Sequence, residues 1–244
     1  MSAVSSAPPR VSVMIPVYNE EESLVTLHRE LDAALASVAG GAEIVFVDDG
    51  SKDRSLAVLR EIAEKDPRVR VVVLDGNHGQ TAAFAAGFDA VRGEITVTLD
   101  ADLQNDPADI PRLIAKLDAE GADVVNGVRQ KRRDSWVRLV SSRIANNARN
   151  WVTNESVTDV GCSLRAMRTE YVKRVRLFRN MHRFLPTLLR MEGATKVIEM
   201  PVAHRERRYG VSKYGIGNRL WVGIVDLFGV RWMQARHFRV RVKD

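Results

Sequence analysis

Ile95-Thr96-Val97-Thr98-Leu99 is a run of apolar and β-branched residues, and Asp100-Ala101-Asp102-Leu103-Gln104 follows it directly. The run predicts a buried strand, which places the carboxylates at its C-terminal end, where open α/β sheets bind ligands. Asp100, Asp102 and the amide oxygen of Gln104 are hard oxygen ligands of the kind that suits Mg2+ or Mn2+ bridging to phosphate. Alone, an Asp-x-Asp pair is more often a solvated surface feature or a helix cap, so the metal interpretation depends on its neighbours.

Apolar runs alternate with helical patterns over the first 128 residues, which predicts an α/β fold with a mostly parallel sheet flanked by helices. We expect strands at 11–17, 44–47, 69–74, 95–99 and 123–126, and helices at 21–38, 55–65, 80–91 and 110–117. After residue 128 the pattern predicts helices at 138–152, 170–177, 183–189 and 216–234, and strands at 160–165 and 197–203.

Composition narrows the class of protein. The chain has 244 residues, of which 45% are hydrophobic, enough for one large α/β domain. Cys162 is its single cysteine, so neither an internal disulfide nor a cysteine-rich zinc site is possible, which fits a reducing compartment. We see no signal peptide at the start and no apolar stretch of the ~18 residues that a membrane span requires.

Charge divides the chain into two unlike halves. Residues 1–128 hold 11 Lys and Arg against 22 Asp and Glu, whereas residues 129–244 hold 26 against 9. A basic half indicates an anionic partner, such as lipid headgroups or a phosphorylated substrate. We expect no nucleic acid, because aromatic residues make up only 6% of the chain and are not interleaved with the basic ones. The lack of a Gly-x-Gly-x-x-Gly after the first strand and of a P-loop argues against dehydrogenases and P-loop kinases.

Three further motifs follow predicted strands. PVYNE at 16–20 can set an aromatic ring and polar groups against a nucleobase, and DDGS at 48–51 can accept hydrogen bonds from a base or ribose. NHGQ at 77–80 opens a helix whose first amides can face a phosphate. Each motif is also compatible with an ordinary capped turn, so only their combination is informative.

Taken in order, PVYNEEES, VFVDDGSKDRS, LDGNHGQTAAFAAG and TLDADLQNDP resemble the family 2, or GT-A, nucleotide-sugar glycosyltransferases. The later segments NGVR, SR, DVGCSLR and RYGVSKY, beginning at residues 126, 142, 159 and 208, look like the polyprenyl-phosphate glycosyltransferases of that family. Dolichyl-phosphate mannose synthase and the bacterial undecaprenyl-phosphate sugar transferases belong to this group. The resemblance implies a GT-A fold and a metal-dependent, inverting transfer of a sugar from GDP-mannose or a UDP-sugar to dolichyl or undecaprenyl phosphate.

The resemblance also implies roles for individual residues. The nucleotide-sugar donor would be bound by Pro16, Tyr18, Glu20, Asp49, Gln80, Asp100, Ala101 and Asp102. The Mg2+ or Mn2+ ligands would be Asp100, Asp102 and Gln104, and the acceptor phosphate would be held by Arg129, Arg143, Arg208 and Lys213. The catalytic set would be Asp100, Asp102, Arg129 and Arg143. Asp159 either orients the sugar or a cation, or only caps a turn.

The expected organisation has three parts. Residues 1–10 are a disordered N-terminus, 11–212 a GT-A catalytic domain (11–128 the nucleotide-sugar half, 129–212 the acceptor half), and 213–244 an amphipathic membrane-interface helix with a basic tail. Trp221, Phe228 and Trp232, with nearby arginines, predict peripheral attachment to an anionic membrane on its cytoplasmic face, unless a small integral membrane partner supplies the anchor.

Two other functions stay open at this point. One is a glycosyltransferase with a soluble hydroxyl acceptor, which would need a general base near that acceptor. The other is a non-catalytic nucleotide-sugar-binding module, which would have no need to keep metal ligands.

Overall fold

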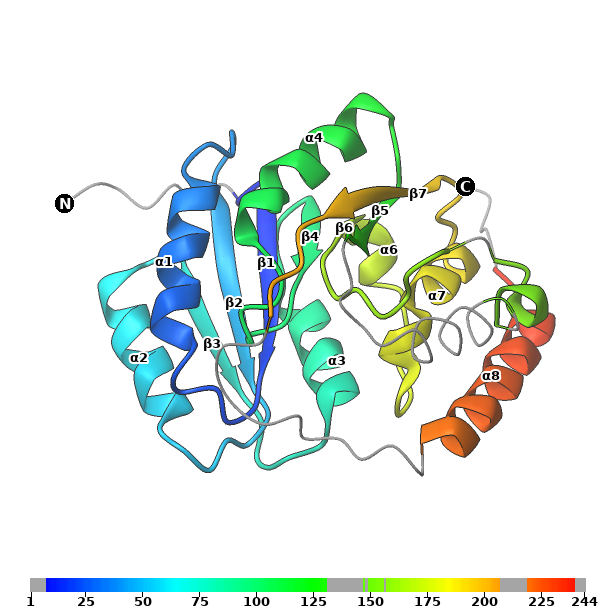
Figure 1. The fold of residues 1–244 in the computed structure, drawn as a ribbon, viewed down its shortest axis with the longest axis horizontal. Helices are drawn as coiled ribbons and strands as arrows, with labels where there is room; N and C mark the ends of the chain where they lie inside the picture. Colours follow the sequence, from blue (N-terminus) through cyan, green and yellow to red (C-terminus); the bar gives the residue numbers. More distant parts are fainter. Residues whose placement is uncertain (1–7, 131–146, 148, 156, 207–218, 240–244) are drawn as a thin grey trace, which may run out of the picture.

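The computed structural model describes residues 8–130, 147, 149–155, 157–206 and 219–239. In this part of the chain one seven-stranded sheet has the order β3-β2-β1-β4-β6-β5-β7 (Figure 1). All neighbouring strands are parallel except β6, which runs antiparallel to both β4 and β5. The strands are β1 (Val11–Val17), β2 (Ala42–Asp48), β3 (Val69–Val73), β4 (Ile95–Thr98), β5 (Val124–Arg129), β6 (Arg165–Arg168) and β7 (Val197–Val202).

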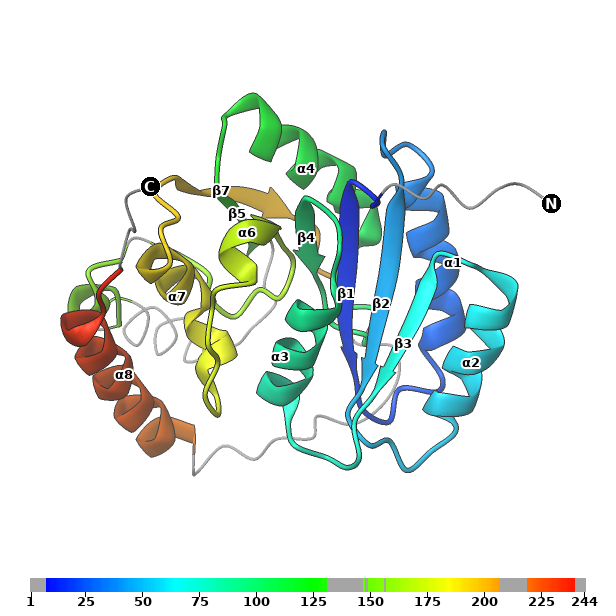
Figure 2. The same cartoon turned by 180° about the vertical axis from the view of Figure 1, so that it is seen from behind.

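Helices cover both faces of the sheet (Figures 1 and 2). One face carries α1 (Leu24–Leu35), α2 (Ser55–Lys65) and α4 (Ile110–Ala119), and the other carries α3 (Gln80–Ala90), α6 (Thr169–Val172) and α7 (Leu185–Met191). Two short 3-10 turns, η1 (Pro107–Asp109) and η2 (Met181–Phe184), precede α4 and α7, and α8 (Arg219–Arg236) lies at the end of the molecule away from β3. None of the helices described here is both long enough and apolar enough to cross a bilayer.

The strands read as continuous apolar runs because both of their faces are buried. In β1, Val13 and Ile15 belong to the core shared with α1 and α4, whereas Met14 between them belongs to the core shared with α3. All three side chains are fully buried. Successive side chains of a strand point to opposite faces, so a strand between two helical layers needs apolar residues at every position.

Most predicted elements are confirmed to within a few residues. Helix α2 has the predicted bounds, and α1 is shorter at both ends than the predicted 21–38. The predicted strand at 160–165 is wrong, because β6 begins only at Arg165. Residues 157–164 form a loop whose carbonyl groups accept side-chain hydrogen bonds at Val157 and Val160 rather than joining a β-ladder. Most of the predicted helix at 138–152 lies outside the described residues.

The order of the strands creates the place for a site. From β1 the chain moves outward through β2 to β3, and then returns to the other side of β1 as β4. Such a reversal leaves a crevice at the carboxyl ends of the strands on either side of the switch point. Val17 of β1 and Thr98 of β4 end at this edge, so the polar segments that follow them come together there.

Candidate functional site

The loops that follow β1 and β2 are joined by reciprocal hydrogen bonds. Asn19 has a left-handed backbone (φ 53°), and its side-chain Oδ1 accepts from the Lys52 amide at 2.7 Å while its own amide donates to Ser51 Oγ at 3.0 Å. The Glu20 amide donates to Ser55 Oγ at 2.8 Å. Because these contacts use backbone amides, they fix the path of the two loops that carry Tyr18, Glu20 and Asp49 at the sheet edge.

Asp49 connects this edge to the start of α3. Its side chain is buried, and its two carboxylate oxygens accept from the amides of His78 and Gly79 at 2.8 and 2.9 Å. Each carboxylate oxygen has a further lone pair, so this structural role leaves capacity to accept from a ligand. The predicted nucleoside contact therefore sits on a rigid support.

Asp100 lies directly after β4 in a charged environment. Gln80 Nε2 donates to its Oδ1 at 2.9 Å. Burial, together with the negative charge of Asp102, raises the pKa of Asp100 to about 6, while a hydrogen bond with Ser163 and the charges of Arg165 and Arg129 act in the opposite direction. Two carboxylates this close are stabilised by a cation between or beside them, and this is the arrangement that a divalent metal site uses.

Asp102 and Gln104 belong to a tight turn. Leu103 between them has φ 61°, in the left-handed region that a branched side chain seldom adopts, and its side chain is buried in the core. Asp102 Oδ1 accepts from the Gln104 amide at 3.1 Å, and the Gln104 carbonyl accepts from the Arg205 amide at 2.8 Å. Backbone strain of this kind persists where surrounding contacts hold it, and it is common at ligand sites.

The residues at this turn fit a magnesium-type site rather than a zinc-type one. The described residues contain no cluster of three or more His, Cys, Asp and Glu side chains able to hold a metal. Mg2+ is commonly held by one or two carboxylates and completed by water and substrate phosphates. Asp100 and Asp102 supply those carboxylates, and the position of Gln104 in the same turn makes its amide oxygen a candidate third ligand.

Arg129, at the end of β5, forms a half-buried ion pair with Asp159. The guanidinium donates through Nε and Nη2 to the two Asp159 oxygens, both at 2.8 Å, and the Arg129 amide donates to the same carboxylate at 3.2 Å. A Cβ on Gly161 would lie 2.6 Å from Arg129 Nη2, so only glycine leaves room for this arrangement. The predicted acceptor residue is thus held in place by Asp159, which gives that aspartate a definite role.

Arg165 is a site residue that the sequence did not single out. Its side chain is buried at the start of β6, where Nε donates to Asn126 Oδ1 and Nη2 to the Val160 carbonyl, both at 2.6 Å. β6 pairs Arg165 with Thr98 of β4, which places this cation beneath Asp100. An arginine inside the apolar run CSLRAM is the sequence signal that could have identified it, since an unpaired charge is not tolerated in a core.

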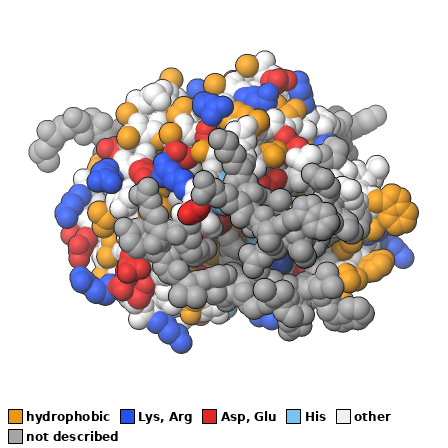
Figure 3. All heavy atoms as spheres, viewed as in Figure 1, with side chains coloured by type: hydrophobic (Ala, Val, Ile, Leu, Met, Phe, Trp, Pro, Cys, Tyr) orange, Lys and Arg blue, Asp and Glu red, His pale blue; other side chains and the backbone are white. Residues whose placement is uncertain are grey.

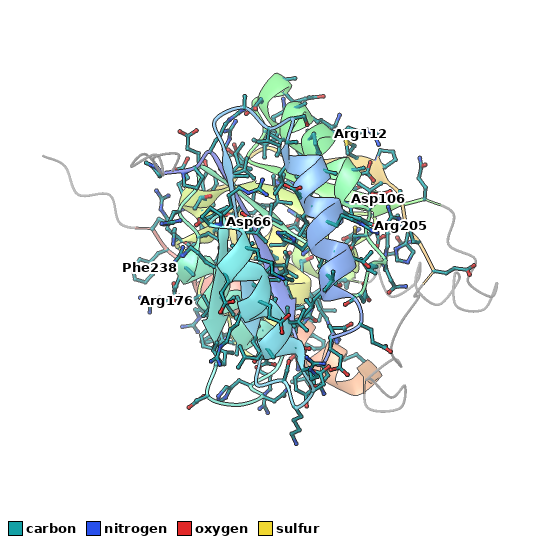
Figure 4. All side chains as sticks on the ribbon, turned by 90° about the vertical axis from the view of Figure 1, so that its left-hand side faces the viewer. Asp66, Asp106, Arg112, Arg176, Arg205 and Phe238 are labelled. Carbon is teal, nitrogen blue, oxygen red and sulfur yellow. The ribbon has the colours of Figure 1, made fainter. Side chains whose placement is uncertain are left out.

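A second arginine, Arg205, ties the segment after β7 to the nucleotide-binding half. Nη1 lies 2.6 Å from Glu30 of α1, and Nη2 lies 2.7 Å from Asp106, which follows the metal-ligand turn. Figure 4 shows Arg205 and Asp106 side by side next to α1, with Arg112 farther away on α4. The Ala203 amide adds a hydrogen bond between the segment after β7 and η1, because it donates to Asp109 Oδ2 at 2.7 Å.

The structure thus brings many of the predicted residues to one edge of the sheet. Asp49, Asp100 and Asp102 lie there on loops that the start of α3 at Gln80 connects, and Tyr18, Glu20, Ala101 and Gln104 belong to the same or adjoining turns. Pro16 lies in the last residues of β1. Arg129 reaches the same region from β5. Arg143, Arg208 and Lys213 lie outside the described residues, so their predicted roles remain predictions.

Comparison with known proteins decides the family. A family model described as glycosyl transferase family 2 matches residues 12–176. The chain belongs to this family. The match covers the nucleotide-binding half and continues through the Arg129–Asp159 pair and β6.

Two relatives of this family 2 member are both named undecaprenyl-phosphate 4-deoxy-4-formamido-L-arabinose transferase. The protein from Edwardsiella ictaluri is 46% identical over 207 residues, which are 84% of this chain and 63% of that protein. The one from Klebsiella pneumoniae subsp. pneumoniae is 45% identical over 206 residues, or 84% of this chain and 62% of that protein. The chain therefore spans less than two thirds of the length of these relatives.

Solved structures of a Mycobacterium tuberculosis enzyme, glucosyl-3-phosphoglycerate synthase, share the fold of this family 2 chain. Its complex with Mn2+, uridine diphosphate and phosphoglyceric acid superposes with a TM-score of 0.68 at 18% identity, over 95% of this chain and 80% of that one. A complex with Mn2+, uridine diphosphate and glucosyl-3-phosphoglycerate gives a TM-score of 0.66 at 19% identity, covering 93% of this chain and 80% of that one. At this level of identity the likeness concerns the fold alone.

Proposed function

We propose that this chain is the catalytic part of a metal-dependent, inverting glycosyltransferase that moves a sugar from a nucleotide sugar to a polyprenyl phosphate. The observation that carries the proposal is the meeting of two unlike sites at one sheet edge. The carboxylates of Asp100 and Asp102 follow β4, and the positive charges of Arg165 and Arg129 act on Asp100, partly offsetting the rise in its pKa that burial and Asp102 cause. The names of the relatives, which are undecaprenyl-phosphate sugar transferases, support the acceptor.

Sugar transfer to a phosphate acceptor does not need a general base. A phosphate oxygen of the acceptor is anionic at neutral pH and can attack the anomeric carbon directly, forming the new C–O bond as the bond to the nucleoside diphosphate breaks and its electron pair leaves with that group. Fixed positive groups favour such a step because charge develops on the leaving group. Asp159 is fully engaged by Arg129, which argues against its acting as a base for a neutral hydroxyl acceptor.

Asp100, Asp102 and Gln104 would hold Mg2+ or Mn2+, which neutralises charge on the diphosphate. Gln80 orients Asp100 through its side-chain amide, and Asp49 fixes the backbone that leads into Gln80 by accepting from the His78 amide. The positive charge of Arg165 favours the ionised form of Asp100 and partly offsets the effect of burial. Arg129, with Arg143, Arg208 and Lys213, would hold the acceptor phosphate, since an arginine fork matches phosphate oxygens.

A donor panel tests the proposal. Release of nucleoside diphosphate from GDP-mannose and several UDP-sugars is measured with and without undecaprenyl or dolichyl phosphate. We expect one donor to be consumed only when both polyprenyl phosphate and a divalent cation are present. Equal turnover with a soluble hydroxyl or phosphorylated acceptor would show that the acceptor is not a polyprenyl phosphate. Donor binding without any transfer would favour a non-catalytic nucleotide-sugar-binding module.

The outer face of α8 supports a membrane as the site of action. Val225, Phe228 and Trp232 are exposed there together with Arg231 and Arg236, although the inner face of the same helix already packs on η2 through Val230. Trp151 and Phe238 are also 86% and 77% exposed. Figure 3 shows hydrophobic side chains beside blue ones at the right-hand edge, which α8 forms in Figure 1. An apolar surface edged by arginines suits an anionic lipid surface.

Liposome binding tests this part of the proposal. We expect the chain to sediment with anionic vesicles, and Phe228→Ser with Trp232→Ser to weaken binding about tenfold or more through lost apolar burial. Val25→Ser is the matched control, because Val25 is 62% exposed on α1 in the nucleotide-binding half. Binding should also weaken in high salt. If vesicles bind the double variant as well as the original chain, α8 is not the contact, and an anchor supplied by a membrane protein becomes the better explanation.

A further inference from the structure

Four consecutive residues at the start of α3 connect three separate parts of the molecule. The amides of His78 and Gly79 donate to Asp49 at the end of β2. Gln80 donates to Asp100 at the end of β4. Thr81 turns the other way, and its Oγ1 contacts the segment that leads into η2, about a hundred residues later in the chain. Residues 78–81 are therefore a junction between the donor side and the η2 segment.

The contact of Thr81 with the η2 segment is a directed pair of hydrogen bonds. Thr81 Oγ1 accepts from the Asn180 amide at 3.0 Å and lies 2.7 Å from His182 Nδ1. The link forms with either tautomer of the neutral ring, because the hydroxyl has one hydrogen to donate and two lone pairs to accept. Burial and the charges of Arg183 and Arg165 lower the pKa of His182 to about 3, so the ring stays neutral and the link does not change near neutral pH. The ring also leans on Phe84 of α3, with centroids 5.8 Å apart.

The opposite side of η2 contacts α8. Met181 and Phe184 of η2 form a small buried cluster with Val230, and Leu227 and Met233 of α8 pack against it. Next to this cluster, Asp226 forms a hydrogen bond with the Asn180 side chain and interacts electrostatically with Arg183. Asp226 is the single acidic residue of α8, on a helix that otherwise carries apolar and basic side chains. Asn180 therefore contacts Thr81 through its backbone amide and Asp226 of α8 through its side chain, next to the apolar contact between η2 and α8.

Asn180 suits this position for a backbone reason as well. Its φ is 65°, in the left-handed region that asparagine tolerates better than most residues. This conformation directs its amide to Thr81 while its side chain bonds to Asp226. A glycine at this position keeps the backbone and removes only the contact with α8, so the two roles can be separated by mutation.

We propose that Thr81 and Asn180 are positioning residues that transmit the placement of α8 to Gln80 and through it to Asp100. Seating of the exposed face of α8 on a lipid surface would then tighten the hold of Gln80 on the metal-ligand carboxylate. This coupling rests on the proposed function for its biological meaning, but the physical connection can be tested without it. It makes α8 more than an anchor, because the helix also helps to order the donor side.

Hydrogen exchange measured by mass spectrometry tests the connection. We expect Asp226→Ala and Asn180→Gly to speed hydrogen exchange of the amides at 78–84 about threefold or more, because each variant breaks one contact between α8 and Thr81. Thr81→Val should raise these exchange rates further. Thr81→Ser keeps the hydroxyl and should restore the original rates. Thr169→Val is the matched control, since it removes a buried hydroxyl bonded to Thr96 at 2.8 Å on another part of the sheet. Unchanged exchange at 78–84 in Asp226→Ala, or an equal effect of Thr169→Val, would overturn the proposal.

Metal affinity gives a second measurement. Mn2+ is titrated in the presence of uridine or guanosine diphosphate and the free ion is followed by electron paramagnetic resonance. We expect Thr81→Val to weaken Mn2+ binding about fivefold and Thr81→Ser to leave it within about twofold. Equal affinity in both variants would show that Thr81 does not position Asp100. If the original chain itself binds no Mn2+, the proposed function fails, and the exchange rates alone decide the coupling.

Discussion

The two halves of this sheet, β1 to β4 with their loops and β5 to β7 with theirs, are built on different principles. In the first, the loops after β1, β2 and β4 are held mainly by side chains that bind nearby backbone amides, as Asn19, Asp49 and Asp102 do. In the second, the loop at 157–163 is held by arginine side chains, among them Arg129 at the end of β5 and the buried Arg165 at the start of β6. The difference predicts different responses to mutation: lost activity with intact stability on one side, and loss of both on the other.

Arg149 shows how far the second half depends on buried charge. It is 8% exposed, and its Nη2 donates to the Val157 carbonyl at 3.1 Å. Burial lowers the pKa of Arg149 to about 10. Three arginines thus surround a loop with one aspartate, Asp159. An excess of buried positive charge is costly on its own, and it becomes favourable where an anionic ligand binds nearby.

The largest expected effect tests the first half. Asp102→Ala should reduce transfer about a hundredfold or more, because the diphosphate loses a metal ligand, while the unfolding midpoint changes little. Activity is measured as nucleoside diphosphate release and stability by urea unfolding. Asp75→Ala, on an exposed carboxylate of the same half, should behave like the original chain. Full turnover by the Asp102 variant, or in EDTA, would contradict the metal site.

Variants in the second half should lower the free energy of unfolding. Arg129→Ala leaves the half-buried carboxylate of Asp159 without its cation, and we expect a loss of about 1–2 kcal/mol in the free energy of unfolding. Arg129→Lys should recover part of it, since an ammonium cannot form the two parallel bonds. The double variant Arg129→Ala with Asp159→Ala should lose less than the single variants together. Strict additivity in urea unfolding would show that the pair is not coupled.

The kinetics of the same Arg129 variant separate the two substrates. Arg129→Ala should raise the apparent KM for lipid phosphate and leave the affinity for the nucleoside diphosphate nearly unchanged in calorimetry. An equal loss of donor affinity would mean that Arg129 does not belong to the acceptor side alone.

A gain in stability is expected at Asp100. Its pKa is raised from 3.8 to about 6 in the folded chain, so the folded state binds this proton more tightly than the unfolded state. Ionisation of Asp100 therefore destabilises the fold, with the full effect above about pH 6 and none below about pH 4. Without metal, Asp100→Asn should stabilise the chain by about 1–2 kcal/mol at about pH 8, and the gain should vanish at about pH 4. Urea unfolding at both pH values checks this, and a loss at high pH would contradict it.

The smallest effect concerns the contact between the halves. Arg205→Ala removes two partly exposed ion pairs, which together contribute about 1 kcal/mol or less. Arg112→Ala removes a single pair with Asp109 inside the first half and serves as the control. We expect the Arg205 variant to have the lower thermal midpoint, because the Arg205 side chain links Glu30 and Asp106, which belong to different elements. Equal midpoints would show that this contact does not help to join the halves.

The first half of the fold could be predicted from the sequence because its signals are local. Strands β1, β2 and β4 are buried on both faces and read as continuous apolar runs, each followed by turn-forming polar residues. Asp100 and Asp102 follow such a run directly, so their place at the sheet edge needed no knowledge of distant residues. β6 was misplaced because its antiparallel pairing with β4 and β5 is set by residues far along the chain.

The sequence by itself thus determined the α/β class, the parallel strands and the carboxylates at the end of β4, because side-chain burial and turn chemistry act between neighbours in the chain. Only the tertiary structure decided that Arg129 is fixed by Asp159, that Arg165 lies under Asp100, and that Thr81 meets the segment before η2. Each of these contacts joins residues that are between 30 and 101 positions apart. Their free energy depends on geometry that no local pattern records, so they emerge only when the sheet is assembled.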